Sequence, residues 1–144
     1  SHTSDRSFWD ILKLAEGPVV ASHSNCRALC DVRRNLTDEQ LRAIRDTGGV
    51  IGVNVYHGFV HAEPRMQTAA MLARHAAHIA ETIGPEHVAC GFDFCEYFGP
   101  GNEGCEGMEN CAQTGNFFFE LERLGFSAAE RQGIASENLL RVLE

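Results

Sequence analysis

The feature of this sequence that most constrains its fold is the alternation of three short apolar runs with segments of helical periodicity. Residues 18–22 (PVVAS), 50–55 (VIGVNV) and 87–92 (HVACGF) have the composition of buried β-strands. Apolar residues at helical spacing precede the first run and separate the others. An order of strand, helix, strand, helix, strand with short connections predicts parallel βαβ units. We therefore expect an α/β protein.

Capping signals place the ends of several helices. Thr37 and Gln40 form a capping box that begins the helix after the first strand, and Gly48-Gly49 is expected to end it. A second capping box runs from Ser127 to Glu130. Residues 94–115 are rich in glycine and lack periodicity, which predicts a long loop of functional importance. Further helices are expected over residues 8–15, 72–83 and 136–143.

Two parallel architectures fit this order of elements, a doubly wound sheet and a (β/α)8 barrel. No GxGxxG or GxxxxGKS sequence follows any of the strands, which weakens the case for a nucleotide-binding sheet. A complete barrel needs about 250 residues, whereas this chain has 144 and opens at Ser1-His2 without an initiator methionine. We therefore favour one domain that forms part of a barrel and belongs to a longer protein.

Charge and cysteine usage exclude some classes of protein. The chain has 20 acidic and 12 basic residues, and this net charge of −8 argues against a nucleic-acid partner. No apolar run approaches the ~20 residues of a membrane span. The six cysteines include no CxxC pair, so we expect reduced thiols and a cytoplasmic location rather than a structural zinc knuckle.

Polar side chains stand at the carboxyl end of each expected strand. His23 follows the first strand, Asn54 and Tyr56 lie at the end of the second, and Asp93 follows the third. His2 precedes a helix and would occupy the same edge if another strand came before it. Ligands of parallel α/β folds gather at this edge, and imidazole with carboxylate suits Zn²⁺ or a similar divalent ion. Hydrogen-bonded loop residues are the alternative interpretation of each position.

The chain contains, in this order and over most of its length, the segments SHTSD, PVVASHSN, RRNLTDEQLRAI, GGVIGVNVY, HIAETIGPEHVACGFDF and ENLLRVLE. With these segments it resembles the membrane (renal) dipeptidase family of zinc metallopeptidases. The 21-residue interval between His2 and His23 is similar to that between two zinc-binding histidines of the family. The resemblance implies that residues 1–144 are the C-terminal half of a metal-dependent dipeptidase barrel whose N-terminal half is absent from this chain.

The resemblance also implies roles for individual residues. His2 and His23 would bind one of two zinc ions, which lower the pKa of bound water to about 7 and so supply a hydroxide for peptide hydrolysis. Arg34 would hold the C-terminal carboxylate of a dipeptide through its planar guanidinium. Asp93 would take a proton from the metal-bound water and pass it to the leaving amine. Asn54 and Tyr56 are expected to contact the substrate.

The sequence departs from the family at informative positions. The family's remaining ligands are a His-x-Asp pair and a bridging glutamate that lie upstream, and no HxD sequence occurs here, so we expect the isolated chain to be inactive. Cys95 stands where the family has a second aspartate, and we expect it to pack rather than bind metal. Phe59 replaces a tyrosine that some relatives have near the substrate. His75 and His78 lie three apart on one helix, and because His75 falls on the apolar stripe we expect a satisfied core or surface pair rather than a shared metal.

Two other functions stay open at this point. The chain could belong to an amidohydrolase that cleaves another amide, a lactam or an ester, or it could be a non-catalytic half barrel that needs a partner. The expected partners are a dipeptide, the N-terminal half of the barrel and, because an open barrel exposes edges, a second copy in a homodimer. Relatives also occur anchored to membranes or secreted, so these locations are alternatives to the cytoplasm.

Overall fold

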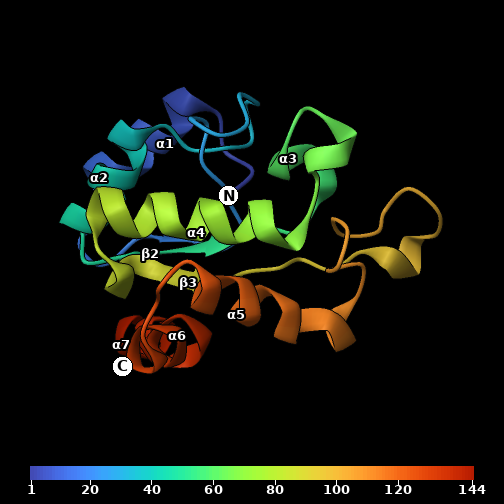
Figure 1. Ribbon diagram of the computed structural model, residues 1–144. Helices are drawn as coiled ribbons and strands as arrows, with labels where there is room; N and C mark the ends of the chain where they lie inside the picture. Colours follow the sequence, from blue (N-terminus) through green and yellow to red (C-terminus); the bar gives the residue numbers. More distant parts are fainter.

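A parallel sheet of three strands forms the centre of the fold. The computed structural model describes residues 1–144 (Figure 1). The strands are β1 (Val20–Ala21), β2 (Val50–Val53) and β3 (Val88–Cys90), arranged in the order β1-β2-β3. The predicted parallel order is confirmed, but each strand is shorter than the apolar run that predicted it. At the start of β1, for example, Val19 N donates to Thr47 Oγ1 at 3.0 Å instead of extending the ladder to β2.

Helices follow the strands as the periodicity predicted. The capping boxes of Thr37 with Gln40 and of Ser127 with Glu130 are both present. The predicted loop 94–115 is largely irregular, although it contains two short 3-10 turns and its last two residues already begin a helix. The helices are α1 (Asp5–Leu14), α2 (Asp38–Asp46), α3 (His57–Val60), α4 (Ala69–Ile83), α5 (Thr114–Arg123), α6 (Ala128–Gln132) and α7 (Asn138–Leu143), with a π-helical segment, Gly133–Glu137, between the last two.

The hydrophobic core lies between the sheet and the helices that cover it. Helix α4 runs across the sheet between α2 and α5 (Figure 1). Strands and helices both contribute side chains that are completely buried: Leu41, Ile44, Ile51, Val53, Leu72, Ile79, Phe117 and Leu121. His75 belongs to this core, which is one of the two outcomes expected for it, and its hydrogen bonds are satisfied: Nδ1 accepts from Cys26 N at 3.0 Å and Nε2 donates to Val60 O at 2.8 Å. The core therefore fixes the strands on which the polar residues stand.

The C-terminal segment closes the amino end of the sheet. Asn138 Nδ2 donates to Pro85 O at 2.9 Å and to Val88 O at 2.7 Å. Arg141 donates from its two terminal nitrogens to Gly48 O and Glu86 O, both at 3.1 Å. These contacts tie the region around α7 to the segments that lead into β2 and β3. The opposite, carboxyl edge is left for the polar residues described below.

All six cysteines are free thiols. Burial raises the pKa of Cys90 and Cys105 to about 12, so these two thiols stay protonated and unreactive at neutral pH. None of the helices combines the length and apolar composition that crossing a bilayer requires.

Candidate metal and substrate site

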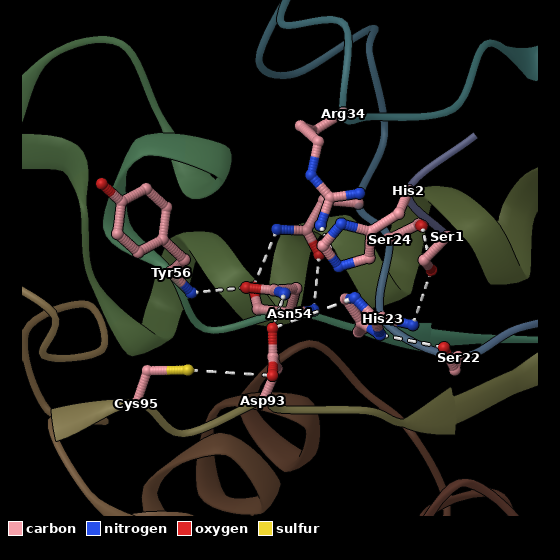
Figure 2. A network of polar contacts seen from close by, with 11 residues as sticks. Ser1, His2, Ser22, His23, Ser24, Arg34, Asn54, Tyr56, Asp93 and Cys95 are labelled. Atoms are coloured by element: carbon pink, nitrogen blue, oxygen red, sulfur yellow. Dashed lines mark hydrogen bonds and ion pairs between the residues drawn. The ribbon is translucent and has the colours of Figure 1, made fainter. Parts of the chain in front are cut away.

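Residues that follow the three strands meet at the carboxyl edge of the sheet (Figure 2). His23 comes from β1, Asn54 from β2 and Asp93 from β3. His23 Nε2 lies 3.9 Å from Asp93 Oδ2, and Asn54 Nδ2 donates to the same oxygen at 3.2 Å. The strand order explains this meeting, because β1 and β3 flank β2. The three side chains thus lie together, as the sequence predicted from their positions at strand ends.

His2 joins this group from the N-terminal segment. Its ring centroid lies 4.9 Å from that of His23, with the ring planes at 63°. His23 Nδ1 is 2.9 Å from Ser22 Oγ, which leaves Nε2 of His23 directed toward Asp93. That Nε2 is buried and has no hydrogen-bond partner. A buried polar atom without a partner is costly, and a bound ion is one of the few ways to satisfy it.

The electrostatics of His23 favour its neutral form. Burial lowers the pKa of this imidazole, and the neighbouring His2 and Arg34 act in the same direction, whereas the Asp93 carboxylate opposes them. A neutral imidazole has a lone pair on one ring nitrogen, and that is the form that binds metal ions.

The backbone is strained at two residues of the site. His2 and Asp93 have φ angles of 62° and 60°, and they are the two residues other than glycine with positive φ. Such a conformation costs about 1–3 kcal/mol per residue and persists where the surrounding structure enforces it, most often at functional sites. Both strained residues are therefore among those that the sequence predicted to form the site.

Arg34 and Tyr56 line the same region. Arg34 Nη2 lies 3.2 Å from His2 Nε2, and the guanidinium carbon lies 5.1 Å from the centroid of the Phe59 ring. The Tyr56 ring packs against Phe59 at 4.8 Å between centroids. Arg34 and Tyr56 are both half-exposed, so each can reach a molecule bound at this edge.

The structure adds residues that the sequence reasoning missed. Asn25 is completely buried, and its amide bonds to both backbone groups of Asn54, accepting from N and donating to O at 2.9 Å in each case. Ser22 is the partner of His23 Nδ1. Both residues belong to the same SHSN segment as His23, and that adjacency is the only signal in the sequence that could have identified them.

The donors present fit part of a metal site. Two imidazoles and a carboxylate suit a divalent ion, and the unsatisfied His23 Nε2 is a free ligand position. Nowhere in the chain, however, do three His, Cys, Asp or Glu side chains come close enough to hold an ion by themselves. Desolvation and the neighbouring Asp93 carboxylate raise the pKa of Cys95, so Cys95 is a neutral thiol rather than a thiolate ligand.

A parallel α/β scaffold that carries imidazoles, a carboxylate and a guanidinium at its carboxyl edge is the arrangement of a metal-dependent hydrolase. Residues 1–144 match the family described as membrane dipeptidase, peptidase family M19, and the chain belongs to this family of metallopeptidases.

The chain is also similar to individual proteins. Dipeptidase ataJ of Aspergillus terreus is 33% identical over 145 aligned residues, which cover 100% of this chain and 34% of that protein. A protein of Klebsiella pneumoniae described as an uncharacterized protein in the pqqA 5′ region is 47% identical over 97 residues, covering 65% of this chain and 36% of its own length. The chain thus spans about a third of the length of these relatives.

A solved structure is similar over nearly the whole chain. It is the crystal structure of a metallopeptidase from Rhodobacter sphaeroides liganded with a phosphinate mimic of the dipeptide L-Ala-D-Ala. The two chains are 28% identical with a TM-score of 0.87, and the match covers 99% of this chain and 40% of that one. The predicted fold class, a parallel α/β portion of a TIM-like barrel, is confirmed.

Proposed function

We propose that residues 1–144 form the C-terminal half of a zinc-dependent dipeptidase and supply one side of its active site. Family membership and the bound dipeptide mimic of the Rhodobacter sphaeroides metallopeptidase support this reaction. The observation that carries the proposal is the meeting of His2, His23 and Asp93 at one edge of a parallel sheet.

An N-terminal half is needed to complete the barrel and the metal site. Strand β1 pairs only with β2, so its other edge is open. A cavity of about 220 Å³ lies beside it, and its lining includes the apolar side chains of Phe8, Val20 and Leu36. A preceding strand would pair with this edge and bring the remaining ligands. We therefore expect residues 1–144 alone to be inactive.

His2 and His23 would bind one of two zinc ions. Once bound, zinc would supply an activated water for attack and polarise the scissile carbonyl. Ser22 holds Nδ1 of His23 and thereby directs the other ring nitrogen, Nε2, to the ion. The burial of Nε2 without a protein partner supports this role.

Arg34 and Asp93 would act on the substrate. The Arg34 guanidinium can bind the terminal carboxylate of a dipeptide through two parallel hydrogen bonds. Asp93 would accept a proton from the attacking water at Oδ2 and deliver it to the leaving amine. Tyr56, half-exposed beside Phe59, would form part of the pocket wall.

We also propose where the protein is located and how its open strand edge is used. Six free thiols favour a reducing compartment such as the cytoplasm. The open edge of β1 is assigned to the N-terminal half, and a homodimer would have to use another surface.

Hydrolysis of a dipeptide panel by the full-length protein with zinc tests this function. We expect cleavage of free dipeptides, loss of cleavage when the substrate's C-terminus is amidated, and large losses in His23→Ala and Asp93→Asn. Equal cleavage of amidated substrates would instead indicate an amidohydrolase with another specificity. Metal binding without any turnover would indicate a non-catalytic protein.

A further inference from the structure

The buried amide of Asn54 links the candidate proton carrier to the interior of the protein. Asn54 is completely buried. Its Nδ2 donates to Asp93 Oδ2 at 3.2 Å, and its Oδ1 accepts from Tyr56 N at 2.7 Å (Figure 2). Both ends of the side chain are therefore engaged by this chain's own groups.

Asn25 fixes Asn54 in place from the other side. Its amide oxygen accepts from Asn54 N, and its amide nitrogen donates to Asn54 O, both at 2.9 Å. Asn25 is completely buried and lies two residues after His23. The backbone of Asn54 is therefore fixed relative to the loop that carries a candidate metal ligand.

The Asp93 carboxylate has few hydrogen bonds besides the one from Asn54. Its side chain is 43% exposed, and its backbone is in the left-handed region with φ 60°. Apart from Asn54, its only hydrogen-bonding neighbour is the weak donor Cys95 Sγ, which lies 3.8 Å from Oδ1. Hydrogen bonds to a charged acceptor are stronger than neutral ones, so the Asn54 bond can select one orientation of the carboxylate.

We infer that Asn54 is a positioning residue that orients Asp93 for proton transfer, rather than a residue that contacts the substrate. This inference rests on the proposed dipeptidase function. The oxygen that Asn54 holds, Oδ2, is also the one that lies 3.9 Å from His23 Nε2. Asn54 thus keeps the proton-accepting oxygen beside the candidate metal ligand.

Two substitutions in the full-length enzyme separate the hydrogen bonds of Asn54. Asn54→Leu removes both, whereas Asn54→Asp keeps an acceptor for Tyr56 N and puts a carboxylate in place of the donor to Asp93. We expect kcat to fall about 10- to 100-fold in both variants, since displacing a reacting group by ~1 Å costs about that much. KM should change by less than about threefold, because substrate binding does not use this amide.

Asn138→Leu is the matched control. Asn138 is also a buried asparagine with two hydrogen bonds to backbone carbonyls, but it acts at the amino end of the sheet. We expect this variant to lower thermal stability and to leave kcat of the folded enzyme unchanged. A comparable fall of kcat in Asn138→Leu would mean that general loosening, not the orientation of Asp93, explains the Asn54 variants.

A crystal structure of Asn54→Asp gives a readout that does not depend on turnover. We expect the Asp93 carboxylate to leave its position beside His23. An unmoved Asp93 with wild-type kcat would overturn the inference, and so would a raised KM at unchanged kcat. If the wild-type enzyme cleaves no dipeptide, the proposed function fails, and the position of Asp93 in the variant alone decides whether Asn54 orients it.

Discussion

His23 and Asp93 face each other across the carboxyl end of β2, with Nε2 of the histidine 3.9 Å from Oδ2 of the aspartate. They follow β1 and β3, which both pair with β2, so the parallel strand order brings them together. An imidazole nitrogen without a hydrogen-bond partner and a carboxylate oxygen thus lie at the same edge of the sheet.

Replacing Ser22 with alanine should weaken metal binding without unfolding the protein. Ser22 Oγ lies 2.9 Å from His23 Nδ1, and by accepting from Nδ1–H it can support the tautomer whose lone pair is on Nε2. Loss of such a partner of a metal-binding histidine costs about 10- to 100-fold in metal affinity. Competition with a chelator measures the change. Ser127→Ala, which removes a distant helix cap, should lower stability but keep the metal affinity. Equal metal affinities in Ser22→Ala and wild type would show that Ser22 does not support His23 as a metal ligand.

Arg34→Lys should impair the cleavage of free dipeptides. Lysine keeps the charge but loses the planar pair of donors and the stacking on Phe59. We expect kcat/KM to fall by about 10-fold or more. The exposed neighbour Arg33 provides the control, because Arg33→Lys should behave as wild type. Steady-state kinetics on one dipeptide decides the matter, and an unimpaired Arg34→Lys enzyme would argue against a carboxylate clamp.

Gly91→Ala should disturb the end of β1 and with it His23. A Cβ at Gly91 would lie 1.8 Å from Ser22 O and 3.0 Å from Gly52 Cα, and backbone atoms cannot easily withdraw. We expect lower thermal stability and weaker zinc binding. The contrasting position is Gly115, where an added Cβ meets nothing within 4 Å. Gly115→Ala lies in α5 and should be neutral or stabilising. Identical melting temperatures for the two variants would show that Gly91 does not lie this close to Ser22 O.

His75 should make the metal-free protein sensitive to acid. Burial lowers the pKa of His75 from 6.5 to about 4, because the charged form is excluded from the core. Its contribution to stability is therefore complete above pH 6.5 and is lost as the pH falls toward 4. The lost stabilisation is on the order of 3 kcal/mol.

Denaturant unfolding of wild type and His75→Gln, both without metal, measures this effect. The variant should be less stable at pH 7.5, because glutamine cannot reproduce both hydrogen bonds of the imidazole, to Cys26 N and Val60 O. The difference in free energy of unfolding should shrink at pH 4.5, because His75 takes up a proton in the unfolded wild type while the core largely excludes it in the folded protein, which favours unfolding. A difference that is constant between the two pH values would contradict the assignment of acid sensitivity to His75.

The sequence was sufficient to predict the order of strands and the edge at which the polar residues meet. Periodicity of apolar residues reports burial directly, and the capping box of Thr37 with Gln40 depends only on residues three apart. The bonds of Asn25 to Asn54 and of Asn54 to Asp93 could not be predicted in the same way. They join loops after different strands, so they depend on the twist and register of the sheet rather than on local pattern.

The backbone conformation of some residues could not be predicted from the sequence either. His2 and Asp93 adopt left-handed conformations, which their residue types tolerate better than most but do not require, so the sequence does not predict them. The short length of β1 follows from the competing bond of Val19 N to Thr47 Oγ1. At the start of β1, a tertiary contact thus overrides the local preference of the chain.

Anomalous X-ray scattering at the zinc edge, measured on crystals of the full-length protein grown with zinc, tests zinc binding by His2 and His23 directly. We predict a zinc ion bonded to a ring nitrogen of His2 and to Nε2 of His23 at about 2.0–2.1 Å, with its signal lost in His23→Ala. A zinc signal elsewhere, with both imidazoles free of metal, would contradict zinc binding by His2 and His23.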